Sequence, residues 1–302
     1  MSVFDRSYRT YHGELRGRFA RIWSIAVNTF NVQFRRKRTI LLMIICNFPV
    51  IAFSFMLIFL AIFAPAGATG FFFQTFLGSL EESLFLIVMS TLNAGSIFMP
   101  IVFIGALNSG VIANDKKHNS LALYMARPID RIDYVLGKAI SVLMINSFVT
   151  YIPWLLYMAI NTLLSGMTGA QFLDSIWVYF AALAAALVMM IFFGSIILLF
   201  SSISEQAILG GIMFILVLFL PGVVSAGINE ALELNFLSYI SVSDLCVSMI
   251  YYMFGKPEGV AGFGIGFLFP DINGWISLAI LLTVSAIAFL LVIIRMNKEE
   301  IH

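Results

Sequence analysis

Residues that could catalyse a reaction are few in this 302-residue chain, and none has the spacing of a catalytic motif. No Gly-x-x-x-x-Gly-Lys-Ser/Thr sequence occurs, so the chain lacks the loop that holds the phosphates of ATP. His12, His118 and His302 are far apart in the sequence, and no Cys/His pattern has the spacing of metal ligands. The apolar segments contain no paired acids or histidine cluster, which argues against an intramembrane enzyme. We therefore predict no catalytic residue, no metal site and no cofactor in this chain.

The segment with the most specific pattern is the basic loop 114–138, with the sequence NDKKHNSLALYMARPIDRIDYVLGK. It combines an apolar centre with Pro128, which disfavours helical geometry in the residue before it. We expect a short helix, a rigid corner and then entry into the next long helix. A rigid protrusion of this kind can transmit force from a docked partner.

Six stretches without any charged residue surround this loop. They are residues 39–80, 83–114, 139–173, 175–204, 206–229 and 272–294. A helix needs about 20 apolar residues to cross a hydrocarbon core about 30 Å thick. The runs do not alternate apolar with polar residues as barrel strands do. We predict an all-α integral membrane protein with six transmembrane helices, at about 40–63, 84–112, 136–164, 175–200, 207–226 and 273–294. Pro153 is expected to kink the third helix.

The basic residues lie on one side of a six-span arrangement. Of 17 Lys and Arg residues, all but Lys256 precede the first run, lie in the 114–138 loop or follow the last run. Positive residues favour the cytosolic side, so both termini and the loop should be cytosolic.

Apolar positions at three- and four-residue spacing across 14–34 predict an amphipathic helix before the first span. The polar N-terminus is too long for a cleavable signal, and no glycosylation sequon occurs, which is compatible with a prokaryotic plasma (inner) membrane.

The polar residues inside the predicted spans are neutral. Charge-free spans disfavour proton- or sodium-driven transport. The spans also lack the ring of charged residues expected of an ion channel. Asn93, Asn108 and Asn146 have two possible roles: hydrogen bonds between helices, worth about 0.5–2 kcal/mol each, or the lining of a path for a weakly polar substrate. Cys46 and Cys246 are expected to be unpaired packing residues.

The end of the loop carries the pattern Pro-x-x-Arg-x-x-Tyr-x-x-Gly-Lys, formed by Pro128, Arg131, Tyr134, Gly137 and Lys138. This pattern resembles the inner loop of ABC-2 type permeases, the membrane subunits of ABC exporters with a type V exporter-like fold. In such permeases an acidic residue, here Asp115, precedes a glycine-containing step, which Asn119-Ser120-Leu121 replaces in this chain. The resemblance extends to the order of elements: a basic elbow helix, six spans and a long outer segment before the last span.

The resemblance implies a permease subunit that exports a hydrophobic or amphipathic substrate. The energy would come from ATP hydrolysed by a separate cytosolic ATPase subunit, which would bind ATP and Mg²⁺. The implied partners are cytosolic ABC ATPase subunits, a second permease copy or paralogue and membrane lipid, without nucleic acid. The alternative is a mechanical or scaffold subunit that transports nothing and passes ATP-driven motion to a periplasmic or envelope partner.

The resemblance also assigns regions and residues. Residues 1–39 would be a cytosolic tail and elbow helix, and 296–302 a second cytosolic tail. Residues 40–295 would be the six-helix domain, with a coupling loop at 114–138 and an outer re-entrant segment at 227–272. The residues expected to couple the chain to the ATPase are Asp115, Leu121, Leu123, Arg127, Pro128, Arg131, Tyr134 and Lys138.

Overall fold

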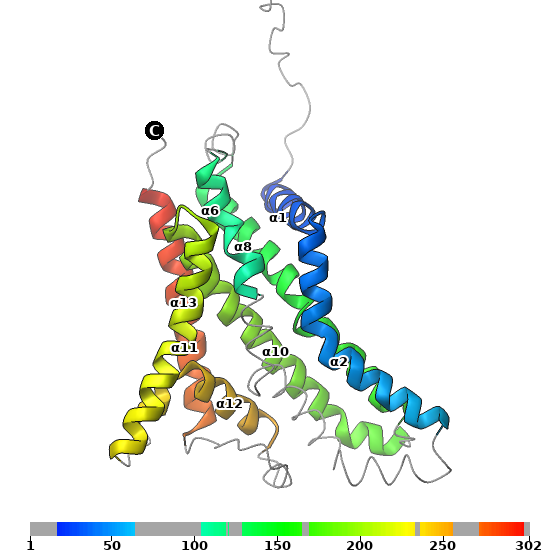
Figure 1. Ribbon diagram of the computed structural model, residues 1–302. Helices are drawn as coiled ribbons and strands as arrows, with labels where there is room; N and C mark the ends of the chain where they lie inside the picture. Colours follow the sequence, from blue (N-terminus) through cyan, green and yellow to red (C-terminus); the bar gives the residue numbers. More distant parts are fainter. Residues whose placement is uncertain are drawn as a thin grey trace, which may run out of the picture.

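The computed structural model describes residues 17–63, 104–118, 120, 129–164, 169–232, 236–255 and 272–298, and it contains no strand within them. Figure 1 shows long helices running between two ends of the molecule, with the C-terminus and α1 at the same end. The helices are α1 (Arg18–Phe34), α2 (Lys37–Phe63), α6 (Gly110–Lys117), α8 (Arg131–Ser147), α9 (Tyr151–Leu164), α10 (Gly169–Ile203), α11 (Ala207–Leu232), the short 3₁₀ helix η2 (Phe236–Tyr239), α12 (Val242–Met253) and α13 (Gly274–Lys298).

Four helical stretches in the described part of the chain are long and apolar enough to cross a membrane. They are Arg131–Ile160, Ile176–Ile203, Ala207–Asn229 and Gly274–Lys298. The first of the predicted spans corresponds to α2, a 27-residue helix whose charged residues are confined to Lys37 and Arg38. Most of the second predicted span, residues 84–103, lies outside the described residues. The all-helical membrane architecture is confirmed, and the count of six stays a prediction.

The third predicted span, 136–164, corresponds to one helical stretch long enough to cross a membrane, Arg131–Ile160, in which a turn at residues 148–150 separates α8 from α9. Pro153 provides the physical reason. It has no N–H to donate to the carbonyl of Val149, and its ring crowds that carbonyl. The chain turns there, and Thr150 N–H and Val149 N–H both donate to the carbonyl of Asn146, at 2.9 and 3.0 Å.

Other helices extend beyond their predicted ends. Helix continues through α6 to Lys117, five residues past the predicted end of the second helix, and α8 begins five residues before the predicted start of the third. The predicted 114–138 loop therefore begins and ends in helix. Similarly, α11 continues past the predicted residue 226, through Pro221, to Leu232. Within this extension, Asn229 Nδ2 donates to Ser238 Oγ of η2 at 3.0 Å.

The predicted outer segment 227–272 contains a buried helix. In α12, Ser241 caps the first turn by accepting the N–H of Asp244 at 3.3 Å, and residues 245–250 are buried against the bundle. Twelve residues of helix extend about 18 Å, which is too short to cross the membrane. Residues 256–271 lie outside the described residues, so re-entry of this segment stays a prediction.

Helix α10 lies at the centre of the bundle and contacts α6, α8, α9, α11, α12 and α13. Its side chains Ala182, Ala185 and Ala186 are fully buried, and small residues of this kind let helices approach closely in lipid. Along α13, a stripe of buried positions recurs every three or four residues: Gly274, Ser277, Leu281, Ser285, Ala288, Val292 and Met296. Cys46 and Cys246 are free and buried, as predicted.

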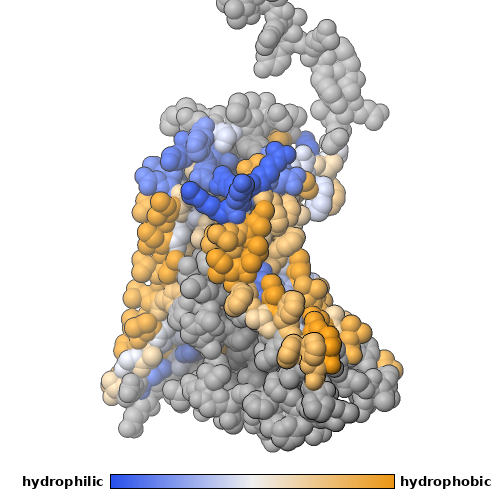
Figure 2. All heavy atoms as spheres, turned by 45° about the vertical axis from the view of Figure 1, so that its right-hand side comes forward, coloured by the Kyte–Doolittle hydropathy of each residue, from blue (hydrophilic) through white to orange (hydrophobic). Residues whose placement is uncertain are grey.

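The surface of the described residues separates into a polar end and an apolar wall. Figure 2 shows hydrophilic residues in a band near the upper end, above a broad hydrophobic surface. The end that carries α1, the C-terminus of α6, the start of α8 and the C-terminus of α13 is called the basic end below. It holds Arg18, Lys117, Arg131 and Arg295.

Candidate coupling site

The first two turns of α8 join three other helices at the basic end. Residues three or four positions apart share a face of a helix. Asp133 and Gly137 therefore lie on one face and meet α1, whereas Tyr134 and Lys138 lie on another and meet α6. Arg131 reaches the C-terminus of α13. Because this helix follows directly after the predicted coupling loop, its contacts determine where motion of the loop would be transmitted.

The contact with α1 is an ion pair around a buried carboxylate. Asp133 is 0% exposed, and its Oδ1 lies 2.6 Å from Arg18 Nε, while its Oδ2 lies 3.5 Å from Arg21 Nη2. The hydrogen bond and the charge of Asp133 raise the pKa of Arg18 above its ordinary value. A buried carboxylate that loses its partners destabilises a protein, because its charge is left uncompensated. The pairing of Asp133 with Arg18 and Arg21 therefore stabilises the packing of α1 against α8.

Gly137 permits this close approach of α1 and α8. A Cβ atom at this position would lie 2.8 Å from Ile25 Cβ and 3.0 Å from the backbone oxygen of Ile22. Ile25 and the neighbouring Ala26 are both buried, so the two helices leave no room for a larger residue. The glycine of the loop pattern is thus explained by helix packing.

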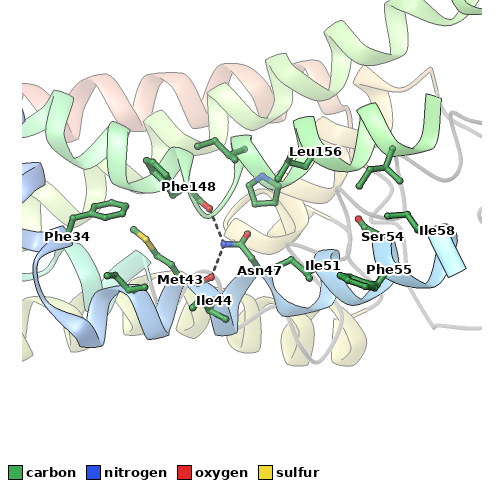
Figure 3. A pocket seen from close by; sticks show the side chains of 14 residues that line it. Phe34, Met43, Ile44, Asn47, Ile51, Ser54, Phe55, Ile58, Phe148 and Leu156 are labelled. Carbon is green, nitrogen blue, oxygen red and sulfur yellow. Dashed lines mark hydrogen bonds between the residues drawn. The ribbon is translucent and has the colours of Figure 1, made fainter. Parts of the chain in front are cut away.

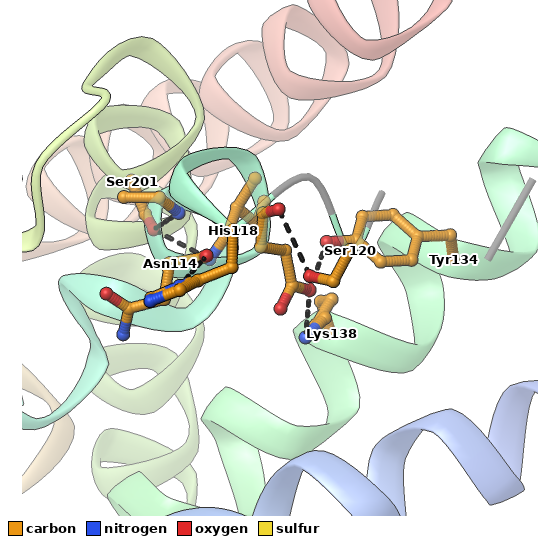
Figure 4. Close-up of polar contacts among 9 residues, drawn as sticks. Asn114, His118, Ser120, Tyr134, Lys138 and Ser201 are labelled. Atoms are coloured by element: carbon orange, nitrogen blue, oxygen red, sulfur yellow. Dashed lines mark hydrogen bonds and ion pairs between the residues drawn. The ribbon is translucent and has the colours of Figure 1, made fainter. Parts of the chain in front are cut away.

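The contact with α6 is a buried cluster of three side chains (Figure 4). Asp115 Oδ2 accepts a hydrogen bond from the Tyr134 hydroxyl at 2.7 Å and lies 2.6 Å from Lys138 Nζ. Tyr134 is fully buried, the side chain of Lys138 is 3% exposed, and that of Asp115 is 18% exposed. Charged hydrogen bonds of this length are stronger than neutral ones. The cluster therefore fixes the end of α6 to the start of α8.

The N-terminus of α6 is capped by a residue from α10. Ser109 precedes α6 but makes no side-chain capping bond. Instead, Ser201 Oγ accepts the backbone N–H groups of Ile112 and Ala113, at 2.9 and 3.2 Å. Free N–H groups in the first turn of a helix need such acceptors when they are buried. This cap joins α6 to α10, and the Asp115 cluster described above joins α6 to α8.

The C-termini of α10 and α13 are held by basic side chains. Lys116 and Arg295 both donate to the carbonyl of Ser202, with Arg295 Nε at 3.0 Å. Arg131 Nη1 donates to the carbonyls of Met296, at 3.2 Å, and Asn297. Cations at helix C-termini satisfy unpaired carbonyls and compensate the helix dipole. Sequence reasoning missed these contacts, although Arg295 near a predicted helix end was a usable signal.

The predicted coupling residues divide into two groups. Asp115, Arg131, Tyr134 and Lys138 are described, and all four contact other helices of the same chain. Tyr134 and Lys138 are buried within the chain, and a role of these four residues in coupling stays a prediction. The other four, Leu121, Leu123, Arg127 and Pro128, lie outside the described residues.

The predicted substrate-path residues Asn108 and Asn146 lie together in the core. Asn108 Nδ2 donates to Asn146 Oδ1 at 2.7 Å and to the carbonyl of Ile104 at 3.0 Å. Both asparagines are 0% exposed. This geometry matches the first of their two possible roles, a hydrogen bond between helices. Asn93 lies outside the described residues.

The fold and the site define a class: a multi-pass helical membrane protein in which hydrogen bonds and ion pairs join the helix ends at the basic end. The family model of the ABC-2 family transporter proteins matches residues 23–301. The chain belongs to this family, and the resemblance in its loop is confirmed. A search of curated proteins gives no match to the chain. Members of the family are transmembrane components of ABC transporters, distinct from the ATPase.

Proposed function

We propose that this chain is the permease subunit of an ABC exporter in a prokaryotic inner membrane, with its basic end in the cytosol. It moves a hydrophobic or amphipathic substrate using ATP that a separate ATPase subunit binds with Mg²⁺ and hydrolyses. Membership of the ABC-2 family supports a permease. The resemblance to exporter permeases supports the choice of cargo, and the gathering of basic residues at one end supports the orientation.

The observation that supports coupling most is the position of α8. The predicted docking loop runs directly into this helix, which is tied to α1 through Asp133, to α6 through Tyr134 and Lys138, and to α13 through Arg131. Pressure from an ATPase on the loop would therefore move four helices together. Two ATPase subunits and a second permease copy or paralogue complete the proposed assembly, with the substrate path between the two permeases.

The test is capture of the ATPase by the solubilised permease, combined with the rate of ATP hydrolysis. Leu123→Glu places an acid at the predicted apolar docking position of the loop. Loss of an interface anchor costs about 2 kcal/mol or more, which is about 30-fold in the dissociation constant. The matched control is Ile240→Glu, the same type of change at an exposed position between η2 and α12, away from the basic end.

We expect Leu123→Glu to lose the ATPase while the protein still inserts into the membrane, and Ile240→Glu to retain it. Unchanged capture and unchanged hydrolysis in both Leu123→Glu and Arg131→Glu would contradict docking at the loop. Uptake of candidate amphipathic compounds into inverted vesicles with the ATPase present separates an exporter from a mechanical subunit.

A further inference from the structure

An open apolar groove lies between α2 and α9 and follows the length of α2 (Figure 3). Its volume is about 460 Å³, within the range of about 300–1,000 Å³ typical of ligand pockets. Along α2 it extends from Ile40 to Ile58, a rise of about 27 Å at 1.5 Å per residue. The opposite wall includes Phe148 and Leu156. The groove thus has the length and the lining for a hydrocarbon chain.

The groove exists because the helix breaks before Pro153. The turn at residues 148–150 separates α9 from the line of α8, and at this turn the carbonyl of Phe148 accepts a hydrogen bond from α2. Asn47 Nδ2 donates to this carbonyl at 3.0 Å and to the carbonyl of Met43 at 2.8 Å. This side chain holds α2 against the break at one level and leaves the apolar walls apart beyond it, as Figure 3 shows. The opening is therefore a built feature of the fold.

A run of basic residues adjoins, along the chain, the residues that line one end of the groove. Phe34 and Ile40 both line the groove, and between them in the chain lie the exposed residues Arg35, Lys37 and Arg38. Arg36 is different, because it lines a separate cleft between α1 and α6. Basic residues at the end of a membrane helix attract anionic headgroups.

We propose that this groove binds one anionic phospholipid of the surrounding bilayer, with its headgroup at Arg35, Lys37 and Arg38 and an acyl chain along α2 and α9. A second copy of the chain fits the same surface less well. Two copies related by a two-fold axis across this groove would bring two identical cationic clusters together at the same membrane depth, and such a contact is repulsive. An anionic lipid complements both the charge and the apolar walls. The proposal does not depend on the transport function.

Native mass spectrometry of the purified protein with phosphatidylglycerol or phosphatidylcholine of identical acyl chains tests the proposal. Ile44→Trp fills the groove at a lining residue that is 56% exposed. The matched control is Ile212→Trp on α11, at a position that is 48% exposed and does not line the groove. A third variant, Arg35→Gln/Lys37→Gln/Arg38→Gln, removes the charge and leaves the groove open. Leu156→Trp fills the other wall and replaces Ile44→Trp if that variant misfolds.

We expect the wild type and Ile212→Trp to retain one phosphatidylglycerol per chain, with about tenfold less retention of phosphatidylcholine. The filled-groove variants should lose the bound lipid, and the charge variant should no longer distinguish the two lipids. Equal retention of phosphatidylglycerol after filling would overturn the proposal. Loss of a dimer on filling, with no change in lipid, would overturn it in favour of a second copy in the groove.

Discussion

The buried pair of Asp115 and Lys138 gives the sharpest test of the proposed junction between α6 and α8. Each is removed separately, as Asp115→Asn and Lys138→Met, and then both together. Breaking a buried ion pair leaves one charge uncompensated and costs about 3–5 kcal/mol. The Lys138 side chain is only 3% exposed, so Asp115→Asn should be the more costly change. Asp115 is 18% exposed and keeps the Tyr134 hydroxyl, so Lys138→Met should lie near the lower limit.

The double variant contains neither buried charge. It should cost no more free energy of unfolding than either single change, so the coupling energy of the cycle should be at least as large as the cost of Asp115→Asn, about 3–5 kcal/mol, at or above the upper end of measured values for contacting residues. Unfolding in mixed micelles by titration with sodium dodecyl sulfate, followed by circular dichroism, measures these energies. The control is Lys117→Met, which removes an exposed lysine from α6, the helix that carries Asp115. It should change the free energy of unfolding by less than about 0.5 kcal/mol.

Additive effects would refute this reasoning. If the coupling energy is below about 0.5 kcal/mol, the lower limit for interacting residues, the 2.6 Å contact does not join the helices as described. A Lys117→Met effect as large as that of Lys138→Met would show that the loss arises from net charge instead of from the buried pair.

Two further predictions concern the other contacts of the junction. Gly137→Ala places a methyl group against Ile25 and should cost about 1–3 kcal/mol; hydrogen exchange should accelerate along α1, and unchanged protection of α1 would contradict the close packing. Ser201→Ala removes the cap on α6 and should cost about 1 kcal/mol, with faster exchange at Ile112 and Ala113. Ser202→Ala is the matched control, because the Ser202 hydroxyl donates to Leu199 in its own helix at 2.7 Å and should not affect α6.

The helical membrane class could be predicted because it depends on composition over long windows. Runs of about 20 apolar residues without charge have one low-energy form in lipid, since the helix satisfies every backbone group internally. The family resemblance likewise came from residues close together in the chain, 128 to 138. Helix ends were less accurate. The break before Pro153 was expected only as a kink, and the extension of α11 to Leu232 was not expected.

The candidate site was only partly predictable. The sequence grouped Asp115, Tyr134 and Lys138 as coupling residues, and the structure shows that their side chains contact one another between α6 and α8. Their role in coupling stays a prediction. For Asn108 and Asn146 the sequence left two roles open, and the 2.7 Å bond between their buried amides favours the structural one. Nothing local to Ser201 indicates that it caps a helix 89 positions earlier in the chain.

The sequence alone therefore determined that this protein is a helical membrane bundle, because the bilayer selects for local properties: length, hydropathy and charge. Only the tertiary structure decided which partners those residues have. Asp133 meets Arg18 across 115 positions, and Arg131 meets the end of α13 across 165. Such contacts depend on how whole helices cross and pack, and helix packing in lipid is set by the shapes of opposing surfaces that no short stretch of sequence contains.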